Sequence, residues 1–391
     1  MNRRALFFAV SAFAWLGCNA LLGNESAVFA PDAGDGATIA DDGGADASNR
    51  DADVDGGDGG DGATPCVDLA SNPRHCGACN HDCFSGACVS GSCQPYAIAI
   101  ETGTPIALTI DATHAYWTND ATGDVKRAPL GGGAAEVIYD GADDTPLGGG
   151  IVRFGAHVYF TIALPAASGG GVFRCPATGC GGAAPQAVVA PLESPAFIGL
   201  AGADTLLVTE FVFDGRVGRC TLPCASGALD VIAPAEGFPK LVTVDGDAYY
   251  WSSLLPGPGA VRWRENATSS PTTLIPGLTV EQVAVVGDEV LFAQRGSGVK
   301  AAPRDGGAIR RIYEPFTQTE RFALDDGGIY FNESLDVGRI VRCPLFGCAD
   351  AGTSVAINQI RPYTIVVDDK RVFWINQGKD NAGGGVHAIA K

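Results

Sequence analysis

Cysteine is the residue type whose number and spacing say most about chemistry in this 391-residue chain. The 13 cysteines separate into the isolated Cys18, a dense group of six and three close pairs. Even groups of this kind predict a disulfide framework in an exported protein, and the count leaves Cys18 alone without a partner. The three pairs are Cys175 with Cys180, Cys220 with Cys224, and Cys343 with Cys348.

The dense group occupies residues 66–93 and has two interpretations. Two residues separate Cys76 from Cys79, and His75 and His81 lie close by, which is a spacing that zinc sites use. A segment this short cannot build its own core, so crosslinks must hold it, and export favours disulfides. Fifteen connectivities are open. We predict a disulfide-rich module that acts as a stiff collar, with cysteines Cys66, Cys76, Cys79, Cys83, Cys88 and Cys93.

The other residue types that perform catalysis do not form an active-site pattern. His114 and His157 stand at matching places before aromatic doublets, which is typical of a strand start. Aspartates recur at the ends of apolar strands and are explained as turn formers, because their carboxylates cap nearby backbone; they are Asp111, Asp245, Asp325 and Asp368. We predict no catalytic residue, no metal and no cofactor. The net charge of −18 argues against nucleic acid as a partner.

The N-terminus has the features of a bacterial export signal. Two arginines precede an apolar run over residues 5–16, which is too short to span a bilayer. The run ends in Leu16-Gly17-Cys18, which resembles the lipobox of bacterial lipoproteins, with Trp15 where that motif usually has leucine. The resemblance implies a signal peptide over 1–18, a lipid anchor on Cys18 and, from Asn19, an outer-membrane location on the cell surface or the periplasmic side. The alternative is an ordinary cleaved signal peptide.

Residues 19–65 differ sharply in composition from the rest of the chain. Aspartate, glycine and alanine dominate, and ten Asp and one Glu stand against one Arg, which gives a net charge of −10. A segment with so little to bury and so much like charge is predicted to be a disordered stalk. Asp51 and Asp53 resemble the start of a calcium loop, but position twelve is Gly62 where such a loop needs glutamate, so we interpret the segment as a spacer.

Residues 94–391 repeat a pattern of four short strands. An aromatic or apolar doublet recurs, and the intervals between its second members are 43, 48, 43, 41, 39 and 43 residues. A period near 43 is that of a β-propeller blade, so we predict an all-β, seven-bladed propeller with four strands in each blade. The doublets are Tyr116-Trp117, Tyr159-Phe160, Leu207-Val208, Tyr250-Trp251, Leu291-Phe292, Tyr330-Phe331 and Phe373-Trp374.

The two ends of the repeat region complement each other. The seventh repeat offers three strands and ends near Ala390, whereas an unassigned apolar strand, Tyr96 to Ile100, precedes the first repeat. We expect this N-terminal strand to become the outer strand of the last blade, because that pairing closes the ring and removes an exposed edge.

One repeat carries a motif of a known group of propellers. Tyr116-Trp117-Thr118-Asn119 resembles the YWTD motif of propellers in lipoprotein-receptor ectodomains, and the strand pattern is similar to NHL and TolB-like propellers. The resemblance implies a propeller fold, an extracellular setting and a role in binding. YWTD and TolB propellers have six blades rather than seven, and Asn119 replaces the final aspartate, so their ligand chemistry is not transferred to this chain.

The leading functional prediction is a monomeric, membrane-anchored lipoprotein whose propeller is a non-catalytic binding or scaffolding module. The loops between second and third strands vary most, and their apolar residues Phe211, Phe213, Leu254 and Leu255 are the candidate site for an unknown protein or glycan. Ordinary loop packing is the alternative for these residues. A propeller enzyme of lyase or lactonase type would instead need carboxylates or histidines converging at the central channel. A TolB-like periplasmic sensor or assembly factor is the third interpretation.

Overall fold

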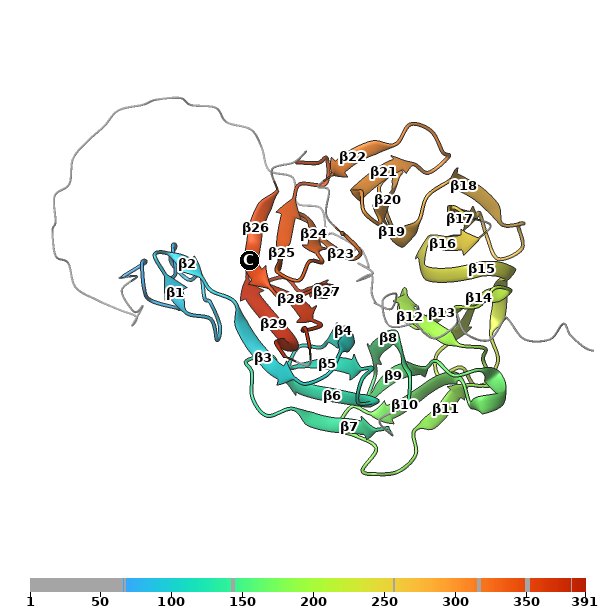
Figure 1. Ribbon diagram of the computed structural model, residues 1–391, viewed down its shortest axis with the longest axis horizontal. Coiled ribbons are helices and arrows are strands. Elements are labelled where there is room, and N and C mark those ends of the chain that lie inside the picture. Colours follow the sequence, from blue (N-terminus) through green and yellow to red (C-terminus); the bar gives the residue numbers. More distant parts are fainter. Residues whose placement is uncertain are drawn as a thin grey trace, which may run out of the picture.

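The structure is a computed structural model that describes residues 66, 68–141, 145–255, 257–314, 318–348, 352–380 and 382–391. Within these residues the fold consists of β-strands arranged around an axis, with one 3₁₀ turn at Ala166–Ser168 (Figure 1). No helix in this part of the chain has the length and apolar character needed to cross a membrane. The predicted signal peptide 1–18 with Cys18 and the predicted stalk 19–65 lie outside the described residues.

Five sheets contain four antiparallel strands each. The sheet that follows the collar contains β4 (Pro105–Ile110), β5 (His114–Asn119), β6 (Asp124–Pro129) and β7 (Glu136–Asp140). The next contains β8 (Leu147–Phe154), β9 (His157–Ile162), β10 (Gly171–Pro176) and β11 (Gln186–Val189). Two more contain β19 (Val280–Val286), β20 (Glu289–Gln294), β21 (Gly298–Pro303) and β22 (Arg310–Tyr313), and β23 (Phe322–Asp325), β24 (Gly328–Glu333), β25 (Gly338–Cys343) and β26 (Thr353–Gln359).

The fifth four-stranded sheet joins the two ends of the repeat region. It contains β27 (Pro362–Val367), β28 (Arg371–Asn376), β29 (Gly384–Ala390) and β3 (Tyr96–Glu101). β3 lies outermost and pairs with β29, with Ile100 opposite Gly385. This confirms the expectation that the N-terminal strand completes the last sheet.

A seven-stranded sheet lies between β11 and β19. Its strands are β12 (Pro195–Ala201), β13 (Thr205–Glu210), β14 (Gly215–Thr221), β15 (Asp230–Asp245), β16 (Ala248–Leu255), β17 (Ala260–Arg264) and β18 (Thr272–Pro276). β15 is 16 residues long and pairs in two directions. Its first part, through Glu236, pairs with β14, and the part from Gly237 onward pairs with β16.

The hydrophobic core lies between neighbouring sheets. Every residue of the seven predicted doublets is buried, because each doublet occupies the middle of a second strand. Successive side chains of a strand point to opposite faces, so the two members pack against different neighbours. Tyr116 packs with Ile151 and Phe160 of the following sheet, whereas Trp117 packs with Tyr363 and Phe373 of the preceding one. The doublet therefore fastens each sheet to both of its neighbours.

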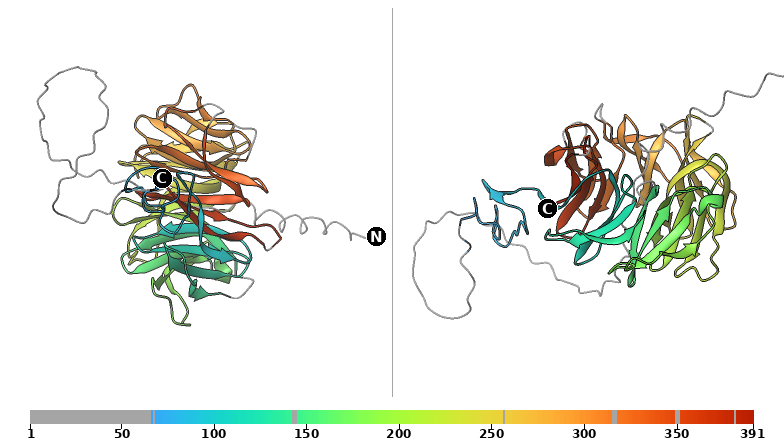
Figure 2. Two further views of the ribbon diagram at one scale, coloured as in Figure 1. Left: turned by 90° about the vertical axis from the view of Figure 1, so that its left-hand side faces the viewer. Right: turned by 60° about the horizontal axis from the view of Figure 1, so that its bottom comes forward.

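The disc has two different faces. Because the strands are antiparallel, the turns from first to second and from third to fourth strands lie on one face. The connections from second to third strands and between sheets lie on the opposite face. We call the second of these the loop face. Figure 2 shows the disc in two further orientations, with residues 66–93 beside its rim.

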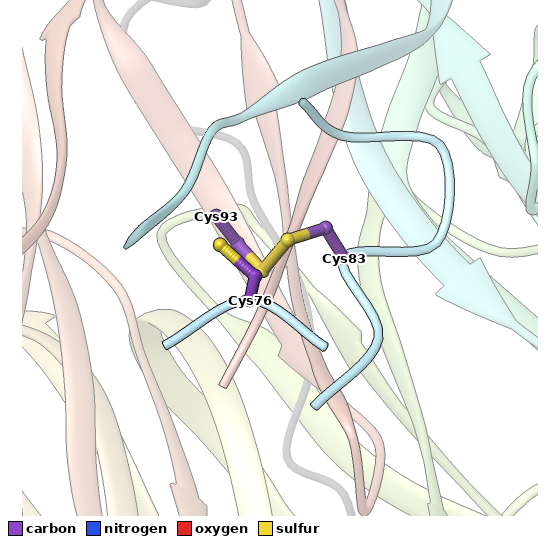
Figure 3. A group of neighbouring side chains, drawn as sticks. All are labelled: Cys76, Cys83 and Cys93. Atoms are coloured by element: carbon purple, nitrogen blue, oxygen red, sulfur yellow. A yellow bond between two sulfur atoms is a disulfide. The ribbon is translucent and has the colours of Figure 1, made fainter. Parts of the chain in front are cut away.

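Residues 66–93 form the predicted disulfide-rich collar, with β1 (Cys88–Val89) and β2 (Ser92–Cys93). Its disulfides are Cys66–Cys79, Cys76–Cys88 and Cys83–Cys93, one of the fifteen open connectivities. The sulfur atoms of Cys76, Cys83 and Cys93 lie within 4.8 Å of one another because two disulfides stack (Figure 3). All three sulfurs take part in disulfides, so the zinc interpretation of this cluster does not hold in the structure.

The collar contacts the disc on the face opposite the loop face, which we call the collar face. Ser85 Oγ donates a hydrogen bond of 2.7 Å to the carbonyl oxygen of Gly131, in the loop that follows β6. The guanidinium carbon of Arg371 lies 4.6 Å from the centre of the Phe84 ring. These contacts give the chain a fixed entry point into the disc.

The three other predicted cysteine pairs form disulfides, Cys175–Cys180, Cys220–Cys224 and Cys343–Cys348. Each stabilises a loop that reaches the preceding outer strand. The amide of Cys180 donates to the carbonyl of Ile138 in β7 at 2.8 Å, and that of Cys348 donates to Ile312 in β22 at 3.0 Å. Cys224 packs with Val188 and Val189 of β11. The disulfide loops thus cover strand edges that would otherwise be open.

Candidate functional site

The first strands of the sheets line the axis and are irregular near their loop-face ends. Register breaks interrupt β4, β8, β12, β15, β19 and β27 at equivalent places. Such bulges re-aim side chains and often lie beside functional sites. The equivalent position is two residues before the one that pairs with the second member of each doublet. Around the ring it holds Ile106, Gly149, Ala196, Lys240, Glu281, Glu320 and Tyr363.

Three neighbouring repeats place charged side chains at this position. Lys240 of β15 and Glu281 of β19 form an ion pair in which both side chains are completely buried. Arg295, which follows β20, holds its Nε 2.9 Å from Oε1 of Glu281 and its Nη2 3.9 Å from Oε1 of Glu320. About 35% of the Arg295 side chain is exposed, so it forms the solvent side of the cluster.

Arg321 ties this cluster to the rest of the ring. Its Nη1 donates to the carbonyl oxygens of Glu281 at 2.9 Å and Glu320 at 3.0 Å, and its Nη2 lies 3.4 Å from the hydroxyl of Tyr363 in β27. The guanidinium carbon lies 5.3 Å from the ring centre of Tyr363 and 5.8 Å from that of Phe197 in β12. One fully buried arginine therefore contacts strands of three other sheets.

The backbone that carries Glu320 and Arg321 is held by Asn332 of β24. The side-chain oxygen of Asn332 accepts the amides of Glu320 at 3.2 Å and Arg321 at 2.9 Å. Its side-chain nitrogen donates to the carbonyl of Pro362 at 2.7 Å. Asn332 is therefore a positioning residue, because it directs an irregular segment toward the axis in place of a regular strand start.

The ionic cluster at the axis shifts the pKa values of Lys240, Glu281 and Glu320 in different directions. Burial lowers the pKa of Lys240 to about 8, although the Glu281 carboxylate opposes this effect. Burial would raise the pKa of Glu281, but Lys240, Arg321 and Arg295 together hold it below its usual value. Burial raises the pKa of Glu320, and the neighbouring Glu281 carboxylate raises it further. Two carboxyl groups in one cluster thus differ in their tendency to hold a proton.

These carboxyl groups partly meet the criterion set for a propeller enzyme. Glu281 and Glu320 do converge at the axis with pKa values displaced in opposite directions, which is a pattern that acid–base catalysts use. Glu281, Lys240 and Arg321 are nevertheless completely buried, and Glu281 is neutralised by the cations around it. The arrangement is therefore suited to holding neighbouring sheets together at the centre of the ring.

Sequence reasoning missed this cluster, although a signal for it was present. When the repeats are aligned on their doublets, the residue ten before the doublet's first member is apolar or glycine in some repeats. It is glutamate at the same position in two successive repeats, in Val280-Glu281-Gln282 and Thr319-Glu320-Arg321. A charge inside an apolar first strand has to be paired in the folded protein, because an unpaired buried charge is costly.

The four predicted partner-binding residues lie on the loop face, beside the ends of β13 and β16 of the seven-stranded sheet. Phe211 is half-buried, and its ring centre lies 5.2 Å from that of Phe238. Leu255 pairs with Gly237, the residue before Phe238, and Leu254 precedes it. Phe213 is 65% exposed. The four residues therefore lie near Phe238 in the structure. We define the apolar ridge as Phe211, Phe213, Phe238, Leu254 and Leu255.

The recurring aspartates and histidines lie where turn-forming residues are expected. Asp111 accepts the amides of Thr113 at 2.8 Å and His114 at 2.9 Å, and the Tyr116 hydroxyl at 2.7 Å. Burial opposes ionisation of Asp111, but these hydrogen bonds together hold its pKa well below the usual value. His114 and His157 begin β5 and β9, as predicted.

Comparison with known proteins identifies the fold. No protein-family model matches the chain, and no curated protein matches its sequence. The WD40 β-propeller domain of Doa1 is 12% identical over 76% of this chain and 97% of that chain, with a TM-score of 0.58. YCF48 from Cyanidioschyzon merolae is 10% identical over 76% and 98%, with a TM-score of 0.56. YCF48 bound to D1 peptide is 12% identical over 76% and 96%, also with a TM-score of 0.56. The chain is a repeat protein with a β-propeller fold.

Proposed function

We propose that this chain is an exported lipoprotein whose seven-bladed β-propeller binds a protein partner through its loop face. The domain boundaries are those expected from the sequence, with a signal peptide at 1–18, a stalk at 19–65, the collar at 66–93 and the propeller at 94–391. Cys18 is the proposed site of lipidation, and the outer membrane is the proposed location.

The blade number rests on how β15 is counted. The five four-stranded sheets are five blades. The seven-stranded sheet divides into two further blades of four strands if β15 serves as the outer strand of one and the first strand of the next. Its two-directional pairing supports this division, because the change occurs between Glu236 and Gly237.

The observation that carries the binding proposal is the orientation of the apolar ridge. The collar enters the disc on the collar face, whereas the ridge lies on the loop face. In a protein tethered through residues N-terminal to the collar, the tether joins the disc on the collar face and leaves the loop face uncovered. Phe213, at 65% exposure, then stands where a partner can reach it.

A protein partner is favoured over a glycan by the character of the ridge. Aromatic and aliphatic side chains predominate in it, which is typical of the centre of protein interfaces. A similar propeller, YCF48, has been solved bound to D1 peptide. This precedent supports a peptide-like segment as the bound element here.

The anchoring part of the proposal is tested by intact mass and fractionation of the wild type and Cys18→Ala in a Gram-negative host. We expect a lipid mass on the wild type in the membrane fraction and release of the variant. If the wild type and Cys18→Ala are both soluble and carry no lipid, the proposed anchor is refuted.

The binding part is tested by replacing Phe213 with a photoreactive phenylalanine analogue in the native host. Phe346 is the matched control, because it is 82% exposed and follows β25 on the collar face. We expect a discrete crosslinked protein from position 213 that Leu255→Ser abolishes. Equal crosslinking from both positions would show that exposed phenylalanine alone explains it.

A propeller enzyme is the second candidate, and Glu281 with Glu320 is the observation that favours it. Catalysis by this pair requires a substrate to displace Arg295 from the solvent side of the cluster. Glu320→Gln would then abolish turnover of a lactone or polysaccharide substrate. A protein that turns over none of these substrates in either form supports the binding module.

A further inference from the structure

A cavity of about 440 Å³ opens on the collar face beside the axis. It is bounded by the collar-face halves of three first strands, β15, β19 and β23. β19 and β23 pack together less closely than the other neighbouring first strands, so the space lies between them. Its size is within the range of small-molecule sites.

Two hydrogen bonds join β19 to the start of β23 at the inner end of the cavity. Gln282 lines the cavity and exchanges these two hydrogen bonds, each of 2.9 Å, with the backbone of Phe322. The residues that precede these two along the chain are Glu281 and Arg321, which belong to the buried ionic cluster. The buried ionic cluster therefore lies next to the inner end of the cavity.

The wall and the rim of this pocket differ in chemistry. Aliphatic side chains form most of the wall, including Val244, Val286 and Leu324. The rim carries three carboxylates, Asp245, Asp325 and Asp326. An aliphatic wall below an acidic rim suits a ligand with a hydrocarbon body and a cationic end.

The rim carboxylates are not fully compensated by the protein. Asp245 pairs with Arg304, and Asp325 pairs with Lys391, whose Nζ lies 2.5 Å from Oδ2. Asp326 is exposed and forms no ion pair among the described residues. Arg342 also reaches this turn, where its Nη2 donates to the carbonyl oxygen of Gly327 at 2.9 Å, but it forms no ion pair with Asp326 among the described residues. The Lys391 ammonium provides a precedent within this protein for a cation at this rim.

We propose that this pocket binds an organic cation, an ammonium group on an aliphatic chain, with Asp326 as its ion-pair partner. The hydrocarbon chain lies against Val244, Val286 and Leu324, and the ammonium group stays at the solvent edge. This site goes beyond the proposed function, since it lies on the face opposite the apolar ridge and depends on neither the lipid anchor nor the partner.

The test is titration of the full-length protein with n-hexylammonium, followed by calorimetry, with n-hexanol as the neutral probe of the same length. We expect saturable binding of the amine and at least about threefold weaker binding of the alcohol, which is what one exposed ion pair contributes. Asp326→Asn should reduce the difference between the two probes to near unity. Equal binding of both probes, or no binding of either, would overturn the proposal.

Asp247→Asn is the matched control, because Asp247 is also an exposed turn aspartate between a first and a second strand but does not line the cavity. It should leave the preference for the amine unchanged. A loss of preference as large as that in Asp326→Asn would show a general effect of surface charge and would overturn the assignment to the pocket. A peptide with one lysine is the second probe. If the peptide binds as the amine does, a protein side chain can be the source of the ammonium group; if only n-hexylammonium binds, the source is a free amine.

Discussion

The Nε2 atom of His81 lies 2.9 Å from the carbonyl oxygen of Lys391, a residue 310 positions further along the chain. The other ring nitrogen, Nδ1, lies 2.6 Å from the carbonyl oxygen of Cys76 within the collar. Lys391 in turn binds Asp325 through its Nζ, which lies 5.4 Å from the ring centre of Tyr330. The collar, the last strand and the sheet β23–β26 are therefore connected through one histidine and one lysine.

Replacing His81 with alanine should loosen the collar without unfolding the propeller. A neutral imidazole has one N–H and donates to one of these two carbonyl oxygens at a time, so the change removes one hydrogen bond, worth about 1 kcal/mol, together with the packing of the ring. We expect faster amide exchange over residues 71–91 in His81→Ala, measured by hydrogen–deuterium exchange. His157→Ala is the control, because His157 begins β9, in a sheet that makes none of the collar contacts described above. Equal exchange in both variants would contradict a docking role.

The two glutamates at the axis should respond oppositely to loss of charge. Glu281→Gln leaves Lys240 buried without its partner and should lower the free energy of unfolding by about 3 kcal/mol. Glu320→Gln removes a desolvated carboxylate that Glu281 repels and should raise it by up to about 1 kcal/mol. Urea unfolding at neutral pH measures both. Destabilisation of similar size in the two variants would show that Glu320 is a needed ion-pair partner.

The benefit of Glu320→Gln should shrink as the pH falls. The pKa of Glu320 is raised in the folded protein, so the folded state binds a proton at a pH at which the unfolded state does not. The wild type therefore gains stability relative to the variant as the pH falls through the folded pKa toward about 4.5. Unfolding curves for both proteins between about pH 7 and pH 5 test this, and a constant difference would mean that the pKa of Glu320 is not raised.

Removal of the Cys175–Cys180 disulfide should expose the outer edge of β7. The crosslink closes a short loop, so its loss costs about 2 kcal/mol by the chain-entropy estimate. The loop also donates the Cys180 amide to Ile138, and that contact orders the edge. For Cys175→Ser with Cys180→Ser we expect a lower urea midpoint and faster exchange in residues 136–140. Unchanged exchange there would show that the loop stays in place without its disulfide.

Local sequence patterns predicted most of the strand architecture. Each repeat contributes one doublet, so the doublets recur every 39–48 residues. Each doublet has two large apolar residues because its members pack into two different cores, and this pattern can be read from the sequence. The strand from Tyr96 to Ile100 could be assigned because one repeat lacked an outer strand. The three close cysteine pairs could be assigned because each falls between the third and fourth strands of its repeat.

Tertiary structure decided which distant residues meet. The collar connectivity depends on how a short chain folds on itself, and spacing alone leaves fifteen solutions. Lys240, Glu281 and Arg321 are each about 40 residues from the next along the chain. They converge because ring closure brings equivalent positions of successive sheets together at the axis. The sequence shows that the position recurs in each repeat, but it does not show how far apart the equivalent residues lie in space. That distance determines whether the buried charges are paired.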